Sequence, residues 1–213
     1  MAGPVIRPDA TGLRAAGDLV AAGGVVLYPT DTLYGMGGDA TQGTVARRIL
    51  TIKGIAGPRP FPILVPSLEV ARAATAARTR PALEVLARAA WPGALTLVVP
   101  LQPDAARRLA PAAPMGTAGF RMPAHPAARY LAARVGGYLI GTSANLAGAP
   151  PPADPDALDP ALVAAADAWI DAAPPCAGLA STVLDLTGDG PVVLRAGELD
   201  LARLLALLEG AGP

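Results

Sequence analysis

The chain has 213 residues, of which 52% are hydrophobic, with 17 basic and 17 acidic side chains. This length suits one domain with a sizeable core, and no apolar run approaches the roughly 20 residues that a membrane helix needs. Zero net charge gives no whole-chain signature of nucleic-acid binding, and one cysteine with one histidine excludes a disulfide framework and a zinc site built from these residues.

The predicted elements alternate between strands and helices. The first twenty residues carry an early charge and proline and no continuous apolar segment, so we expect no secretory signal and a cytoplasmic location. Runs rich in valine, isoleucine and leucine then alternate with alanine-rich helical stretches, which predicts an α/β fold. In chain order the segments are GGVVLYPT, TVARRILTI, PFPILVP, SLEVARAATAAR, PALEVLARAAW, ALTLVVP, GGYLIGTSAN, STVLDLTGD and PVVLRAG.

Several boundaries can be placed in this pattern. Ser67 suits a helix N-terminus, Pro126 suits a first helical turn, and Asp200 can cap the last helix. The proline-rich and aspartate-rich residues 147–160 predict a surface loop, because strands that need a sheet follow them. The strands after residue 137 end in polar or glycine residues, where sites commonly lie. We expect one domain spanning residues 1–213.

Polar residues first interrupt the apolar chain at residues 28–40, YPTDTLYGMGGDA. Hydroxyls and free backbone N–H groups at a strand end can hold a carboxylate or a phosphate. A turn made of good turn formers is an equally good interpretation.

The one lysine of the chain lies in ILTIKGIAGPRPFPILV, whereas arginine supplies all other positive side chains. A lysine that is merely solvated fits this composition poorly, so Lys53 suggests a specific contact. Lys53 and Arg59 flank a glycine and proline loop, and a compact ammonium suits phosphate oxygens, although the spacing is not that of a P-loop. The alternative is a surface salt bridge.

Later clusters add small hydrogen-bonding groups and two arginines. Arg121 can grip a carboxylate with both arms, whereas His125 has no nucleophile near it in sequence and is expected to be structural. These groups suit a polar molecule with an anionic part. The candidate residues are Thr117, Arg121, Ser143, Asn145, Ser181, Thr182 and Arg195.

The segments YPTDTLYGMGGDA, IKG, WPGALTLVV, FRMPAHP, GTSANLAG, STVLDL and LRAGEL together resemble the YrdC-like family of threonylcarbamoyl-AMP synthases. The resemblance spans about residues 24–200 and implies a twisted, open mixed sheet with flanking helices and a concave active-site cavity. It also implies the short, single-domain type of the family.

The resemblance implies a reaction in which threonine and bicarbonate or CO2 form a carbamate that attacks ATP, giving threonylcarbamoyl-AMP and pyrophosphate. Mg²⁺ would accompany ATP, and other proteins would transfer the group to adenosine 37 of tRNA. By motif, the threonine-binding residues would be Thr32, Arg121 and Ser181. Lys53 would act in catalysis and would line the ATP site with Thr117, Ser143, Asn145 and Arg195.

Two positions depart from the family pattern. Lys53-Gly54-Ile55 has isoleucine where the family has arginine, and each lost charged hydrogen bond is worth on the order of 1.5–3 kcal/mol. Arg59 is expected to fill that position and to share the catalytic and ATP-binding roles. The family also tends to have a polar residue near Pro66, which this chain lacks.

Two other functions compete with the synthase. A catalytically impaired family member would bind nucleotide or RNA without releasing pyrophosphate. A carbamoyltransferase of hydrogenase maturation would carry acylphosphatase and zinc-finger segments, and the sequence contains neither.

Overall fold

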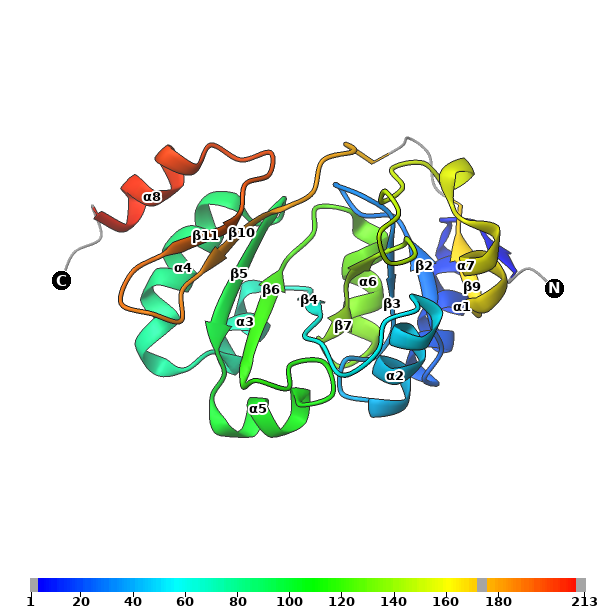
Figure 1. Ribbon diagram of the computed structural model, residues 1–213, viewed down its shortest axis with the longest axis horizontal. Helices are drawn as coiled ribbons and strands as arrows, with labels where there is room; N and C mark the ends of the chain where they lie inside the picture. Colours follow the sequence, from blue (N-terminus) through cyan, green and yellow to red (C-terminus); the bar gives the residue numbers. More distant parts are fainter. Residues whose placement is uncertain (1–3, 172–175, 210–213) are drawn as a thin grey trace.

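The computed structural model describes residues 4–171 and 176–209 (Figure 1). Its strands are β1 (Val5–Ile6), β2 (Val26–Tyr28), β3 (Gly35–Gly37), β4 (Pro62–Leu64), β5 (Leu95–Pro100), β6 (Thr117–Arg121), β7 (Leu139–Ile140), β8 (Thr142–Ser143), β9 (Ala168–Ile170), β10 (Thr182–Asp185) and β11 (Val192–Arg195). Its α-helices are α1 (Ala10–Ala21), α2 (Gly43–Ile52), α3 (Leu68–Ala74), α4 (Arg80–Ala90), α5 (Pro103–Leu109), α6 (Pro126–Arg134), α7 (Pro160–Ala165) and α8 (Leu201–Glu209).

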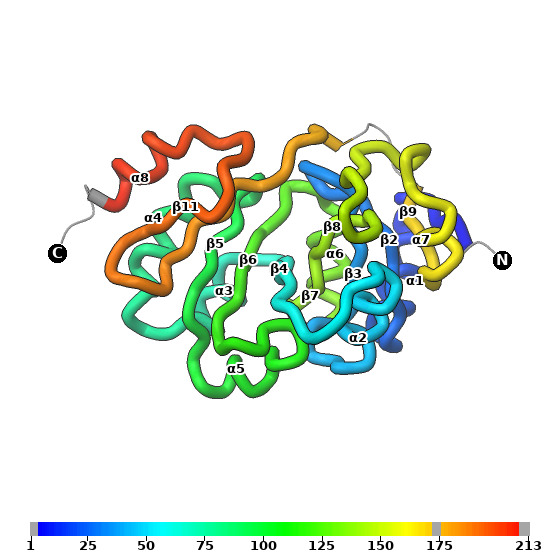
Figure 2. Tube along the Cα trace, in the orientation of Figure 1, coloured from blue at the N-terminus to red at the C-terminus, as the bar shows by residue number. Residues whose placement is uncertain are grey.

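The strands form two mixed sheets, so the α/β prediction is confirmed. The small sheet has the order β1-β9-β2-β3-β8, and the large sheet has the order β11-β10-β5-β6-β4-β7. In the large sheet β4 runs parallel to β6 and β10 runs parallel to β5, while β5 and β6 are antiparallel. The sheets lie side by side along the long axis of the molecule (Figure 2).

Alternating apolar side chains explain how helices cover the small sheet. Along β2, Val26 and Tyr28 pack in one buried cluster with side chains of α1 and α6, whereas Leu27 packs in the other cluster with side chains of α2. Strand β2 is therefore buried on both faces, as its unbroken apolar sequence predicts.

Helices α3, α4 and α5 cover one face of the large sheet. Side chains of α3, α4 and α5 form one cluster with Leu95, Leu97, Phe120 and Leu184, and Figure 1 shows α3 and α4 behind β5 and β6. On the opposite face, Leu64 of β4 and Leu139 of β7 pack against α6, whereas Val98 of β5 is less buried.

The predicted boundaries agree with the structure. Ser67 is the residue before α3, Pro126 is the first residue of α6, and Asp200 Oδ1 accepts from Arg203 N at 3.2 Å at the start of α8. None of the helices in the described part of the chain is long and apolar enough to cross a membrane.

The segment GGYLIGTSAN is divided rather than continuous. Strand β7 belongs to the large sheet and β8 to the small sheet, with Gly141 between them. Gly141 N donates to Pro62 O at 2.8 Å, and a Cβ atom at this position would lie 2.6 Å from Leu64 Cγ. A glycine is required here because the chain passes this close to β4 as it changes sheets.

Candidate active site

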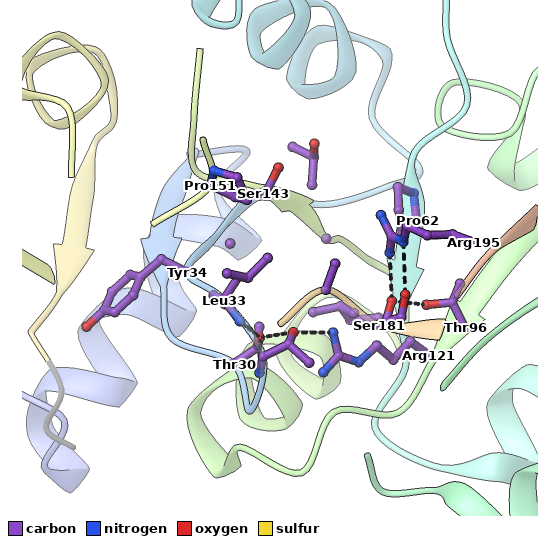
Figure 3. Close-up of a pocket in the computed structure, with 16 residues that line it drawn as sticks. Thr30, Leu33, Tyr34, Pro62, Thr96, Arg121, Ser143, Pro151, Ser181 and Arg195 are labelled. Atoms are coloured by element: carbon purple, nitrogen blue, oxygen red, sulfur yellow. Dashed lines mark hydrogen bonds between the residues drawn. The ribbon is translucent and has the colours of Figure 1, made fainter. Parts of the chain in front are cut away.

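A cavity of about 200 Å³ lies where the two sheets meet (Figure 3). Strands β4, β6 and β11 end at it, while β5 and β10 begin at it, so one edge of the large sheet supplies most of its floor. The ends of β8 and β11 lie at the cavity, as the prediction at strand ends expects, whereas β10 reaches it at its start rather than its end. The lining residues are Thr30, Thr32, Leu33, Tyr34, Gly35, Pro62, Leu64, Thr96, Arg121, Gly141, Thr142, Ser143, Pro151, Ala180, Ser181 and Arg195.

Arg121, the last residue of β6, is buried with 7% of its surface exposed. Its Nε donates to Gly93 O at 3.0 Å, and its Nη1 donates to Thr32 Oγ1 at 2.7 Å. Its Nη2 lies 2.8 Å from Asp31 Oδ1, an ion-pair distance, yet the geometry is not that of a hydrogen bond and Nη2 has no hydrogen-bond partner among the described residues. A buried donor in this state favours an anionic ligand.

The Thr30–Thr32 turn is held by hydroxyl contacts. Thr30 Oγ1 donates to Leu33 O at 2.7 Å and lies 3.0 Å from Thr32 Oγ1, which receives the Arg121 bond. Backbone bonds from residues 177–178 fix the same turn, since Gly178 N donates to Thr32 O at 2.8 Å. The turn is therefore set before any ligand arrives.

A second polar group stands at β10 and β11. Arg195 Nε and Nη2 donate to the backbone oxygen and hydroxyl of Ser181 at 2.9 and 3.0 Å, and the hydroxyl lies 2.9 Å from Thr96 Oγ1 (Figure 3). Partial burial, followed by the nearby charge of Arg121, lowers the pKa of Arg195. The two guanidinium groups thus act on the same region.

Lys53 and Asn145 stand behind the cavity wall rather than among its lining residues. Lys53 Nζ donates to Ser143 O at 2.7 Å and to Asn145 O at 2.6 Å. Burial lowers the pKa of Lys53 to about 8. The Asn145 amide donates to Ala149 O at 2.6 Å, so it too is occupied within its own loop.

Thr117 and Arg59 lie away from the cavity. Thr117 begins β6 and Arg121 ends it, a separation of about 13 Å at roughly 3.3 Å per residue. Arg59 is exposed in the loop before β4, the parallel neighbour of β6, so it belongs to the same end of the sheet as Thr117. The structure does not bring Arg59 to Lys53 or to the cavity, and its role in place of an arginine at position 55 stays a prediction.

The lone histidine is structural, as expected. His125 precedes α6, and its Nδ1 accepts from Ala127 N at 3.2 Å. Burial lowers its pKa, although the charge of Asp31 opposes this effect.

Sequence reasoning missed several lining residues. Thr96 is the only polar residue within the apolar run ALTLVVP, a signal that could have marked it. Pro151 lies in the segment interpreted as a surface loop, yet it lines the cavity, and the next residue accepts from Tyr34 N at 2.9 Å. Part of that loop is therefore a wall of the site.

Comparisons with known proteins place this site in a family. The Sua5/YciO/YrdC family model, described as telomere recombination, matches residues 18–197. The chain belongs to the Sua5/YciO/YrdC family. A Mycobacterium tuberculosis protein of this kind is 36% identical over 197 residues, which cover 92% of this chain and 89% of the relative, and its name assigns it provisionally as a threonylcarbamoyl-AMP synthase.

Two further family members are named for their function or ligand. The threonylcarbamoyl-AMP synthase of Bacillus subtilis is 33% identical over 86% of this chain, which spans 53% of the relative's length. The crystal structure of P. abyssi Sua5 complexed with L-threonine matches with a TM-score of 0.83 and 30% identity over 98% of this chain and 61% of that chain. The Sua5/YciO/YrdC fold expected from the sequence is thereby confirmed.

Proposed function

We propose that this chain is an ATP-dependent nucleotidyltransferase that makes threonylcarbamoyl-AMP and pyrophosphate from L-threonine, bicarbonate and ATP. One observation carries the proposal: the buried Arg121 lines the cavity with an Nη2 atom that pairs with Asp31 but makes no hydrogen bond, in a chain that matches a relative solved with L-threonine. In the proposal the threonine carboxylate accepts from Arg121 and the adjacent Thr32 hydroxyl orients the amino acid.

The reaction has two steps. The threonine amine attacks the carbon of bicarbonate, and water leaves to give a carbamate. A carbamate oxygen then attacks the α-phosphorus of ATP, and the bond to the bridging oxygen breaks, so that pyrophosphate leaves with the electron pair. The chain's contribution is to position the reactants and to neutralise charge.

The Arg195 group supports a second anionic position beside the first. Ser181 and Thr96 orient the Arg195 guanidinium, for which the described residues provide no carboxylate partner. In the proposal this charge faces the carbamate and the α-phosphate, where negative charge is greatest in the transition state.

The open face of β6 supports a path for the rest of the nucleotide. Thr117, Gly119 and Arg121 share one face, because side chains alternate along a strand. Gly119 places no side chain on this face, where a Cβ atom would lie 3.3 Å from Thr96 Cγ2. The proposal extends ATP from Arg195 towards Thr117, with Arg59 reaching it only if its loop moves.

Mg²⁺ is proposed to enter as part of the ATP substrate. Within residues 4–171 and 176–209, no group of three or more His, Cys, Asp or Glu side chains is placed to hold a metal ion. Triphosphate oxygens are hard ligands of the kind that Mg²⁺ prefers. The product would pass to separate transfer proteins that modify adenosine 37 of tRNA.

The test is pyrophosphate release by the purified protein, with threonine and bicarbonate each supplied or omitted. Release that requires both co-substrates and ATP supports the synthase. Nucleotide binding without release under any mixture would instead indicate a binding protein. An Arg59→Ala variant in the same assay decides whether the exposed loop arginine takes part, because a surface residue without a role leaves the rate unchanged.

A further inference from the structure

The side chain of the single lysine, Lys53, donates hydrogen bonds to backbone carbonyl oxygens. Lys53 follows the last residue of α2 and is 6% exposed, and its Nζ is in range of three acceptors of one loop: Ser143 O, Asn145 O and Asn145 Oδ1, the last at 3.4 Å. Its own carbonyl accepts from Ala147 N at 3.2 Å. The loop 143–147 therefore contacts both the side-chain ammonium and the backbone carbonyl of Lys53.

The described residues provide no carboxylate that pairs with this ammonium. A buried charge without a counter-ion is retained only when it is well hydrogen-bonded. An ammonium has three donors on one compact atom, whereas a guanidinium spreads its donors over a planar fork. The convergence of carbonyl oxygens on one point explains why this position is lysine in a chain that otherwise uses arginine.

The loop that Lys53 holds forms part of the cavity wall. Thr142, Ser143 and Pro151 line it, and the loop between them is closed by Tyr34 N, which donates to Pro152 O. Ser143 Oγ also bonds Asn145 Oδ1 at 2.5 Å, so a shift of Asn145 would turn the Ser143 hydroxyl.

We propose that Lys53 is a positioning residue: its ammonium clamps the carbonyl groups of Ser143 and Asn145 and so sets the cavity wall formed by residues 142–151, rather than contacting substrate phosphate itself. The assignment of the wall to substrate binding rests on the proposed function. The clamp itself is a property of the ligand-free protein and can be tested without catalysis.

The experiment compares amide hydrogen exchange in wild-type protein and Lys53→Met without ligand, followed by mass spectrometry of peptides covering residues 139–152. Each hydrogen bond to a charged group is worth a factor of about ten or more, so exchange at Ala144 and Ala147 should rise at least about ten-fold. Peptides covering β5 and β6 should be unchanged. Arg47→Met, at an exposed position of the preceding helix α2, is the matched control and should leave all peptides as in wild type.

A Lys53→Arg variant separates positioning from phosphate contact. If the clamp is the function of Lys53, the arginine variant also loses protection in residues 139–152, because a planar fork cannot replace the point donor. Protection within two-fold of wild type in both variants, together with lost ATP affinity, would overturn the proposal and make Lys53 a direct phosphate ligand. Absence of pyrophosphate release in wild type would count against the synthase alone, since exchange is measured without substrates.

Discussion

Arg121 and Arg195 bring two guanidinium groups to one small cavity, and only the first has a carboxylate beside it. In the proposed reaction this difference gives the two arginines separate roles. Arg121 is fixed by Gly93 and Thr32 and is paired with Asp31, although its Nη2 makes no hydrogen bond. Among the described residues Arg195 bonds Ser181 and has no carboxylate partner, so more of its charge is available. A substrate with a carboxylate at one end and a developing negative charge near it suits this pair.

Arg121→Lys should weaken threonine binding by about ten-fold to a hundred-fold, because charged hydrogen bonds of about 1.5–3 kcal/mol are lost with the planar fork. Calorimetric titration with L-threonine measures the change. Arg107→Lys is the control, since Arg107 is exposed on α5 and does not line the cavity. Equal affinities in wild type and Arg121→Lys would remove Arg121 from the threonine site.

The pKa of Lys53 predicts how stability depends on pH. Its pKa is about 8 in the folded chain and 10.5 as the ordinary value, so between these pH values the unfolded chain binds more protons. The free energy of unfolding of wild type, minus that of Lys53→Met, should therefore rise with pH from about 8 towards 10.5, by at most about 1.4 kcal/mol per pH unit.

Urea titrations of both proteins at pH 7.5, 8.5 and 9.5 measure this difference. Subtracting the variant removes the contributions of other groups that titrate in the same range. A difference that stays flat or falls with pH would show that the lysine is not desolvated in the folded chain.

At the scale of elements, the division of one apolar segment into β7 and β8 joins the sheets and shapes the cavity. Gly141 and Leu64 both line the cavity and face each other across the crossing. A side chain at position 141 would push Leu64 from its place, which affects the core and the site together.

Gly141→Ala should destabilise the protein by about 1–3 kcal/mol, because overpacking displaces Leu64 and the backbone. The midpoint of urea unfolding measures this loss. Gly190→Ala is the control, since a Cβ at Gly190 would meet nothing within 4 Å. A variant as stable as this control would show that the crossing can relax without strain.

The helices and strands show what local sequence can predict. The long apolar run ALTLVVP identifies β5, because most of its side chains are buried in the folded chain. The three residues of β9 have no such signal, since they become a strand only by pairing with β1 and β2 on either side. Gly141 likewise marks a change of sheet only when Leu64 is known to stand opposite.

The candidate site follows the same division. Thr32, Arg121, Ser143, Ser181 and Arg195 come together at the cavity, as the family motifs implied. Lys53, however, has acceptors about ninety residues away in the chain, so its contact with backbone oxygens cannot be predicted from neighbouring sequence. Thr117, which the motif places with Lys53, and Arg59, which is expected to replace the missing arginine, lie at the far end of β6 and β4.

At the scale of the whole molecule, the cavity exists only while both sheets are folded, because the small sheet and the large sheet each line it. A ligand that binds there stabilises the complete fold. Threonine at 100 times its dissociation constant should add about 2.7 kcal/mol to the free energy of unfolding and raise the melting temperature.

Scanning calorimetry with L-threonine, with D-threonine as the control, measures this effect. ATP with Mg²⁺ should give a further increase. A melting temperature that neither ligand changes would mean that the cavity does not bind them in the folded protein.

The order of strands has a consequence for biosynthesis. Strand β9 lies between β1 and β2 in the small sheet, although β4, β5, β6 and β7 of the large sheet separate it from β2 in the sequence. As the chain leaves the ribosome, β1 and β2 must wait for residues 168–170 before their sheet can close, and chains held open in this way depend on their late segments to bury exposed strands. Arg195 follows later still. The nascent chain can therefore complete the cavity only after residue 195 has left the ribosome.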